Sequence, residues 1–583
     1  MEKGITMKRI TFGTPEEIVP TKFCKGLNYR ETEIGYNIDN FKFKITKRGC
    51  VLEFPLLADE QVFGFGLQLR GFNHKNNKLQ LRTNSDPIAP TGDSHAPVPF
   101  FVTNKGYGMY FDSARYLEVH CGYGKNKNRP PEEDNTVIAT VEDLQRKCRL
   151  NETTVMSVEI PYAKGIDVYI FEGKNILDVV SQYNMFSGGG CDVPEWGLGF
   201  MYRANAKSTG DDVIALAKYL RENDIPCETI GLEPGWQSSS YPCSFVWDKE
   251  RYPNYKEVIK YLKDNGFHIN LWQHAFVGSS SPIYRKIAPY CGDYEVWKGI
   301  VPDFSMEEAQ KIFADFQREN FVEQGIDSFK LDESDNSDFV HSWGFPNCAE
   351  FPSGMDGEQY HQLFGTLYMQ TILRALGDTK TFSEGRNASA LAASYPFVLY
   401  SDLYDHEDFI RGVVNSGFSG LLWTPEVRET QSKKDFLRRL QTNVFSVQCL
   451  VNSWYCSYVP WKEFDCETEV RALLEVRQTL IPMLKQAFAE YKETGKPPIR
   501  ALVCDYTDDE ETYRLDNEYI FCDNLIVAPL TAESDTRKVY LPKGAWRDYW
   551  TKEAVNTGWF EVTTENIPVY EKNIPQKGRE FCS

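Results

Sequence analysis

Apolar and polar residues alternate in short runs over the first third of the chain. The runs 41–45, 62–66 and 107–111 place an apolar or aromatic residue at every second position, and Gly, Pro, Asn and Asp separate such runs. A period of two residues indicates half-buried strands, and the intervening residues indicate turns. Because continuous helical periodicity is scarce there, the pattern predicts a β-sandwich over residues 1–193.

The pattern changes near residue 194, where strand-like apolar runs begin to alternate with amphipathic helical stretches. The expected strands are 197–204, 228–232, 268–272, 328–331, 380–383, 397–401, 420–424 and 448–453. The expected helices among them are 211–222, 255–263, 306–321, 358–376, 406–415 and 435–446. About eight such units predict an α/β fold, a (β/α)8 TIM barrel over residues 194–495. Strand-like runs then return, which predicts a small C-terminal β domain over residues 496–583.

Two long insertions, 277–305 and 334–357, follow expected barrel strands. Segments that follow barrel strands emerge on the catalytic face of this fold. We therefore expect both insertions to shape the substrate site.

Charge and cysteine usage narrow the class of protein. The 583 residues include 64 Lys and Arg against 83 Asp and Glu, a formal net charge of −19, which argues against a nucleic-acid partner because phosphates require a basic face. No window approaches ~18 uninterrupted apolar residues, and the first residues lack an apolar leader, so neither a membrane span nor a secretory signal is expected. Fifteen cysteines without a CxxC pair favour reduced thiols in a cytoplasmic protein over a zinc site.

Polar and aromatic residues gather where the expected barrel strands end, and such positions are catalytic candidates. In the stretch 329–338, Phe-Lys-Leu-Asp-Glu-Ser-Asp-Asn-Ser-Asp, an apolar run gives way to four carboxylates; a solvated loop is the alternative interpretation. The candidates at all strand ends are Glu233, Trp236, Trp272, His274, Lys330, Asp332, Arg386, Asp402, Trp423 and Asn452. Paired acids with aromatic platforms are suited to glycoside cleavage, whereas no glycine-rich phosphate loop or metal-ligand cluster is visible.

Several motifs occur in order along nearly the whole chain. They include Phe-Gly-Phe-Gly at 63–66, Pro-Val-Pro-Phe-Phe at 97–101, Pro-Glu-Trp-Gly-Leu-Gly-Phe at 194–200, Lys-Leu-Asp-Glu at 330–333, Asn-Ser-Gly-Phe-Ser-Gly-Leu-Leu-Trp at 415–423 and Leu-Ile-Val-Ala-Pro-Leu at 525–530. In this order they resemble glycoside hydrolase family 31, the family of α-glucosidases, α-xylosidases and α-galactosidases. The resemblance implies a β-sandwich, a catalytic barrel and a C-terminal β domain.

The same resemblance implies a retaining mechanism. Asp332 matches the nucleophile that forms a covalent glycosyl intermediate, and Asp402 matches the acid/base residue. The second match is looser because Ser401 replaces a family glycine, and Asp405 stands nearby as the alternative acid/base or as the cap of the next helix. Arg386 would link the nucleophile region to the sugar, a structural ion pair being the other interpretation. The acids that follow the nucleophile in the stretch 333–338 are expected to be peripheral.

Departures from the family pattern bear on the substrate. Glu233, in Gly-Leu-Glu-Pro-Gly-Trp, stands where the family carries an aspartate that binds sugar hydroxyls, and Glu426 replaces a family aspartate near the arginine. The family histidine after strand 8 is absent at 452–454, and His274 either compensates or only packs. We therefore favour an α-galactoside and keep α-glucosidase and α-xylosidase open, together with an inactive sugar-binding relative, a lyase and a transglycosylase. A small oligosaccharide or glycoside is the expected partner, no cofactor or metal is implied, and the oligomeric state, a homo-oligomer included, is left open.

Overall fold

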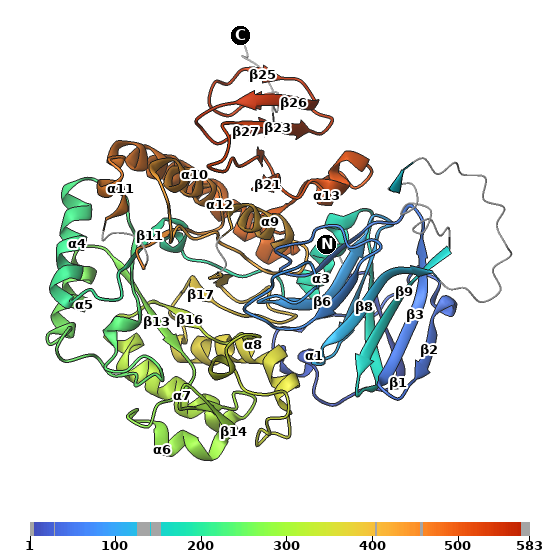
Figure 1. The fold of residues 1–583 in the computed structure, drawn as a ribbon, viewed down its shortest axis with the longest axis horizontal. Coiled ribbons are helices and arrows are strands. Elements are labelled where there is room, and N and C mark those ends of the chain that lie inside the picture. The colour runs from blue at the N-terminus through green and yellow to red at the C-terminus, as the bar shows by residue number, and fades with distance from the viewer. Residues whose placement is uncertain are drawn as a thin grey trace, which may run out of the picture.

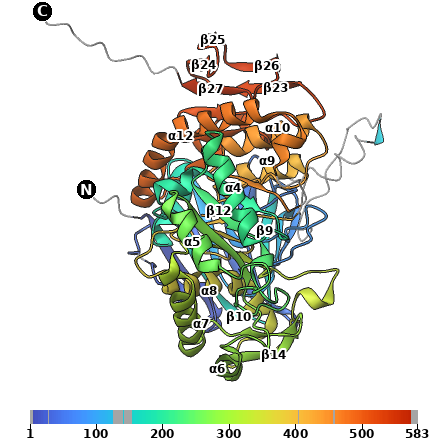
Figure 2. The same cartoon turned by 90° about the vertical axis from the view of Figure 1, so that its left-hand side faces the viewer.

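The computed structural model describes residues 5–27, 29–124, 140–141, 153–402, 405–454 and 459–572. Figure 1 shows the N-terminal strands packed beside a barrel, with the C-terminal strands above the helices α9, α10 and α12. The view turned by 90° shows the C-terminal strands again above α10 and α12 (Figure 2). Among the described residues, no helix combines the length and apolar character needed to cross a bilayer.

The N-terminal region consists of two five-stranded antiparallel sheets packed face to face. The first sheet has the order β1 (Met7–Thr14), β10 (Lys164–Glu172), β7 (Tyr107–Asp112), β6 (Pro97–Thr103) and β4 (Val62–Gly66). The second has the order β2 (Lys42–Ile45), β3 (Gly49–Leu57), β9 (Thr153–Pro161), β8 (Leu117–Gly124) and β5 (Lys78–Leu81). Leu52, Phe101 and Val158 are among the buried residues between the sheets. The predicted β-sandwich is therefore present, because alternating side chains of both sheets share one core.

The middle of the chain folds into a curled parallel sheet surrounded by helices. The strand order is β18 (Phe397–Leu399), β17 (Ser383–Gly385), β16 (Ser328–Asp332), β13 (His268–His274), β12 (Thr229–Leu232), β11 (Phe200–Ala204) and β19 (Cys449–Asn452). The surrounding helices are α4 (Gly210–Glu222), α5 (Tyr255–Asp264), α7 (Glu307–Asn320), α8 (Gly357–Leu376), α9 (His406–Ser416), α10 (Lys433–Val444) and α12 (Glu467–Thr494). The predicted (β/α)8 barrel is confirmed.

One expected strand differs from the prediction. The segment 420–424 forms no regular strand, and parallel bridges from Trp423 to Leu399 and from Val427 to Val451 close the barrel instead. Pro425 lies between the two bridges and has no N–H to donate, so a continuous ladder is interrupted there.

Helix α8 couples the barrel to the sandwich. Its N-terminus carries a capping box in which Asp356 and Gln359 satisfy each other's backbone N–H groups. Almost all of its side chains are buried, because the helix is covered on both sides. Gln362 accepts a hydrogen bond from Thr83 of the sandwich at 2.6 Å, and Glu358 accepts one from the Tyr116 N–H at 2.9 Å.

The C-terminal region contains a six-stranded and a two-stranded antiparallel sheet. The larger sheet has the order β20 (Ile499–Ala501), β21 (Tyr519–Phe521), β22 (Leu525–Val527), β27 (Val569–Lys572), β24 (Trp546–Asp548) and β25 (Ala554–Val555). The smaller pairs β23 (Thr536–Leu541) with β26 (Gly558–Thr563). The predicted C-terminal β domain is therefore present, and α12 leads into it from the barrel.

Candidate active site

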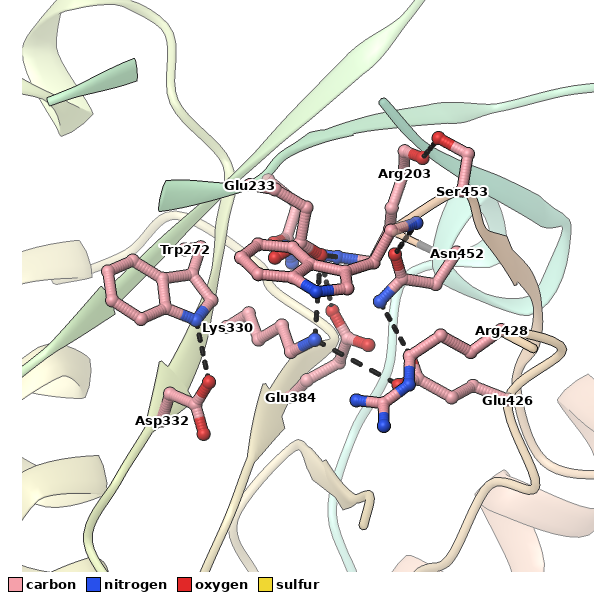
Figure 3. Close-up of polar contacts among 12 residues, drawn as sticks. Arg203, Glu233, Trp272, Lys330, Asp332, Glu384, Glu426, Arg428, Asn452 and Ser453 are labelled. Carbon is pink, nitrogen blue, oxygen red and sulfur yellow. Dashed lines mark hydrogen bonds and ion pairs between the residues drawn. The ribbon is translucent and has the colours of Figure 1, made fainter. Parts of the chain in front are cut away.

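The parallel strands of the barrel bring most of the candidate residues to one edge of the sheet. Arg203 lies in β11, Glu233 follows β12, Trp272 and His274 end β13, Lys330 and Asp332 lie in β16, Glu384 lies in β17 and Asn452 ends β19. Because carboxyl ends of parallel strands meet at the same rim, residues far apart in sequence converge there. Figure 3 shows the side chains of Arg203, Glu233, Lys330 and Glu384 close together, with Trp272 and Asp332 beside them.

Asp332 is held at the end of β16 by two N–H donors. The indole N–H of Trp272 donates to Oδ2 at 2.6 Å, and the backbone N–H of Glu333 donates to Oδ1 at 2.9 Å. Glu333 has φ of +58°, a left-handed conformation that is uncommon outside glycine. The Asp332 side chain is buried, so both oxygens are fixed in orientation without being fully solvated. This arrangement suits a carboxylate that must meet a reacting atom in a defined direction.

Asp402 follows β18 and lies between two guanidinium groups. Arg386 contacts its Oδ2 at 2.7 Å, and Arg428 binds its Oδ1. Burial acts to raise the pKa of Asp402, but the two guanidinium groups outweigh this effect and hold the pKa below its usual range. The side chain is 45% exposed, and is therefore accessible from the mouth of the site.

Asp405 has a different environment from Asp402. Its side chain accepts a hydrogen bond from the Asp408 N–H at 2.9 Å and caps the N-terminus of α9. A capping carboxylate satisfies an otherwise unpaired helix donor. Of the two interpretations of Asp405, the structure therefore supports the helix cap.

Asp335 is not peripheral, contrary to the expectation. It is buried, and its Oδ2 accepts from Arg386 Nε at 2.9 Å and contacts His95 Nδ1 at 2.6 Å. The other ring nitrogen of His95 lies 2.5 Å from the hydroxyl of Ser401. His95 comes from the sandwich, so the N-terminal region ties together the segments that carry Asp332, Arg386 and Asp402. Asp338 remains peripheral, paired with Arg82 at 2.6 Å.

A network of buried charges forms the floor of the site (Figure 3). Arg203 donates to Glu233 at 2.5 Å and to Glu384 at 2.6 Å. Lys330 lies 3.5 Å from Glu233 and 3.9 Å from Glu426. Burial raises the pKa of Glu384 to about 7, although Arg203 and Lys330 act in the opposite direction. The floor therefore combines two paired cations, Arg203 and Lys330, with carboxyl groups whose pKa values differ, since that of Glu233 is lowered and that of Glu384 is raised.

Some polar atoms of this floor have no hydrogen-bond partner in the described part of the chain. They are Glu384 Oε1, Glu426 Oε1 and Asn270 Nδ2. Glu426 Oε2 accepts from Asn452 at 3.3 Å, so Asn452 holds this carboxylate in place. Buried polar groups without hydrogen-bond partners carry a substantial free-energy cost.

Three aromatic candidates pack behind the site. Trp236 is fully buried and donates its indole N–H to the Trp272 carbonyl oxygen at 2.7 Å. Trp423 is also buried and donates to the Phe409 carbonyl oxygen at 3.2 Å. His274 is fully buried, and burial lowers its pKa to about 3. Trp236 and Trp423 are thus packed and hydrogen-bonded within the protein, and burial favours the neutral form of His274.

Aromatic side chains from both long insertions meet at the mouth of the site. Trp297, from 277–305, lies with its ring centroid 5.4 Å from that of His274 and 4.9 Å from that of Tyr241. Trp343, from 334–357, lies 5.9 Å from Trp297. Tyr241 is 44% exposed and donates a hydrogen bond to Glu333 at 3.2 Å. The insertions thus reach the carboxyl end of β13, as their position after barrel strands predicted.

The sequence contained signals for some of the residues that the candidate set omitted. Arg203 and Glu384 also end barrel strands, and the rule that selected Arg386 applies equally to them. His95 and Arg428 carried no comparable signal. His95 contacts residues 240 and 306 positions away, and Arg428 follows the isolated bridge at Val427. Within the described residues, no group of three or more His, Cys, Asp or Glu is arranged to hold a metal ion.

Comparison with curated proteins gives distant relatives that align with most of the chain. Alpha-glucosidase 2 of Bacillus thermoamyloliquefaciens is 25% identical over 575 residues, which cover 90% of this chain and 68% of the relative. An alpha-xylosidase of Emericella nidulans is 21% identical over 518 residues, covering 84% and 62%. The chain thus spans about two thirds of the length of these two relatives.

Solved structures share the fold. A GH31 dextranase of Flavobacterium johnsoniae, complexed with glucose, superposes with a TM-score of 0.77 at 22% identity, covering 92% of this chain and 68% of that one. A GH31 alpha-xylosidase from a soil metagenome, complexed with xylose, gives a TM-score of 0.75 at 20% identity, covering 92% and 82%.

Models of two known domain families match the barrel and the C-terminal β domain. The "Glycosyl hydrolases family 31 TIM-barrel domain" matches residues 191–487, just over half of the chain. The "Glycosyl hydrolase family 31 C-terminal domain" matches residues 495–573. The resemblance seen in the sequence motifs is thereby confirmed, and the chain belongs to glycoside hydrolase family 31.

Proposed function

We propose that this glycoside hydrolase is a retaining α-glycosidase that removes a terminal α-linked sugar. Asp332 attacks the anomeric carbon while Asp402 protonates the leaving oxygen, and Asp402 then deprotonates the water that releases the sugar from Asp332. The observation that carries the proposal is that Arg386 contacts carboxylates of two different segments. It lies 2.7 Å from Asp402 Oδ2 and 2.9 Å from Oδ2 of Asp335, three residues after Asp332.

The floor of the site supports recognition of a neutral, hydroxyl-rich ligand. Its cations are already paired with carboxylates, as in the contacts of Arg203 with Glu233 and Glu384. Glu384 Oε1 and Glu426 Oε1, which have no hydrogen-bond partner among the described residues, suit hydroxyl donors. We assign recognition of this ligand to the barrel, residues 194–495. The sandwich, residues 1–193, supplies His95, and the C-terminal β domain, residues 496–583, remains outside the site.

For the identity of the sugar, we favour a terminal α-galactoside. The Glu233 side chain is one methylene group longer than that of the family aspartate, and it is fixed by Arg203 and Lys330, which lower its pKa despite the opposing effect of burial. Because its carboxylate is held at a different position from that of an aspartate, Glu233 should accept from a sugar hydroxyl group at a different position. The names of the relatives support α-glucoside and α-xyloside as the second candidates.

A panel of p-nitrophenyl α-glycosides tests the proposal. We expect cleavage of the α-galactoside over the α-glucoside and α-xyloside, and proton NMR of the first product should show the α-anomer. Release of the β-anomer would contradict retention, and an unsaturated product would indicate a lyase. A folded protein that binds sugars but cleaves none of the panel or of matching oligosaccharides would be an inactive relative.

A further inference from the structure

Arg428 contacts Asp402 at more than one atom. Its Nη1 binds the side-chain Oδ1, and its Nη2 donates to the backbone carbonyl oxygen of Asp402 at 3.3 Å. Arg386 occupies the other side-chain oxygen, Oδ2. The two carboxylate oxygens are therefore held by different guanidinium groups, and neither shares an oxygen with the other.

The barrel fixes the position of Arg428. The preceding residue, Val427, pairs with Val451 of β19 through a parallel bridge, and the Asn452 N–H donates to the Val427 carbonyl oxygen at 2.7 Å. Arg428 itself is 9% exposed, and its charge is also influenced by Glu426. A guanidinium held by the barrel wall acts on Asp402 as a fixed charge rather than as a mobile surface group.

Arg386 and Arg428 differ in the groups that they contact. Arg386 donates to Asp335 at 2.9 Å and also feels the charge of Asp332, so three carboxylates compete for it. Arg428 meets the side chain and the backbone of the same residue, Asp402. Arg428 therefore binds Asp402 at both its side chain and its backbone, whereas Arg386 binds only the side chain.

From this geometry, and resting on the proposed function, we propose that Arg428 is a positioning residue for Asp402, binding its carboxylate opposite Arg386 and thereby controlling when that carboxyl holds a proton. In the first step the bond from Asp332 to the anomeric carbon forms as the bond from that carbon to the leaving oxygen breaks, and the Asp402 proton moves to the leaving oxygen. In the second step Asp402 takes a proton from water as that bond breaks and the water oxygen bonds to the same carbon. A cation on Asp402 favours its anionic form, so Arg428 assists the second step and opposes protonation before the first.

Other charged and titratable groups also face Asp402. Lys330 acts in the same direction as the two arginines, while Glu333 and Tyr400 each feel the Asp402 charge. Burial and the neighbouring carboxylates raise the pKa of Glu333 well above its usual range, and burial raises that of Tyr400. These shifts act against negative charge on both groups, whereas Arg386, Arg428 and Lys330 favour the anionic form of Asp402 and oppose the effect of its burial.

The test is the pH dependence of kcat/KM for wild type, Arg428→Gln and Arg428→Met. The substrate should be an α-glycoside with a poor leaving group, because such a leaving group requires proton donation. Loss of the nearby cation raises the pH at which Asp402 loses its proton, so the basic limb of the profile should move upward by about one pH unit. Arg428→Lys keeps a charge without the planar fork and should restore part of the wild-type limb.

Two controls separate this effect from general damage. Arg471→Gln removes an arginine that pairs with Glu467 on α12 at 3.1 Å, and the basic limb should stay in place. With an activated aryl glycoside, which needs little proton donation, the limb movement in Arg428→Gln should largely disappear.

A basic limb that does not move in folded Arg428→Gln or Arg428→Met overturns the proposal, as does an equal loss of activity at every pH. The pH dependence of unfolding provides a readout that needs no catalysis. The destabilisation caused by Arg428→Gln should shrink as the pH falls below the ordinary pKa of an aspartate, because the unfolded chain then binds the proton and the lowered pKa of Asp402 in the folded wild type contributes less stability. A constant destabilisation would contradict the proposal. A wild type that cleaves no α-glycoside would refute the proposed function, while the unfolding measurement would still decide the coupling of Arg428 to Asp402.

Discussion

Replacement of Trp272 by Phe removes one N–H donor from Asp332 and leaves most of the ring in place. The indole N–H donates to Asp332 Oδ2 at 2.6 Å, while the ring packs against Tyr241 at 5.4 Å and His274 at 5.5 Å between centroids. A phenyl ring keeps these packing contacts. The main change is therefore one hydrogen bond to a charged oxygen.

The two chemical steps should respond differently to Trp272→Phe. In the second step Asp332 departs from the sugar and regains negative charge, which the indole N–H stabilises. In the first step that charge is being lost, so the donor stabilises the starting state more than the transition state. A hydrogen bond to a charged group is worth about 1.5–3 kcal/mol, and partial charge development would leave about 1 kcal/mol in the second transition state. This corresponds to about a fivefold decrease in the rate of sugar release.

Pre-steady-state kinetics with an activated aryl α-glycoside measures this difference. Trp272→Phe should show a larger burst of the released phenol, with kcat falling and KM falling further, so that kcat/KM rises. Trp423→Phe is the matched control, because its N–H donates to the neutral Phe409 carbonyl oxygen at 3.2 Å. A loss confined to kcat/KM without a burst, or an effect equal to that of Trp423→Phe, would refute the proposed position of the indole donor on the departing carboxylate.

The remaining predictions concern the acid/base residue and a buried carboxyl of the C-terminal region. Asp402→Ala should slow substrates with poor leaving groups most, and azide should restore turnover of activated substrates; equal losses without rescue would contradict the acid/base role. Asp405→Ala should instead lower the free energy of unfolding by about 1 kcal/mol and leave the leaving-group dependence unchanged. Burial raises the pKa of Glu518 from 4.5 to about 7, so the folded state binds its proton more tightly, and stability should fall as the pH rises through this window. Urea unfolding of Glu518→Gln should show a flatter pH dependence between those values than wild type, and an unchanged slope would remove Glu518 as a cause.

Much of the fold was predictable because it depends on local periodicity. Strand β16 ends at Asp332 and α8 covers 357–376, within a residue or two of their expected bounds, since apolar runs and helical faces are read along a continuous segment. The segment 420–424 looked equally apolar but forms only isolated bridges. This segment fails to form a strand because Pro425 interrupts it and because Trp423 and Val427 pair with different strands, β18 and β19. Apolar periodicity reveals neither feature.

The site was predictable only as far as strand ends determine it. Position after a strand correctly brought Glu233, Lys330 and Asp332 to one rim, but it did not distinguish Trp272, which faces Asp332, from Trp236, which packs behind it. The direction of a side chain beyond a strand depends on the tertiary packing of the loop. Contacts from other segments, such as those of His95 and Arg428, arise only when the whole chain folds.

Covalent labelling of the nucleophile tests the central claim most directly. A 5-fluoro-α-glycosyl fluoride of the preferred sugar should accumulate the glycosyl intermediate, because the fluorine slows its hydrolysis more than its formation. Peptide mass spectrometry should then find the sugar on the peptide that contains Asp332, and Asp332→Asn should remain unlabelled. Label on a peptide containing Asp402, or an active enzyme that inverts its substrate and takes no label, would contradict the account.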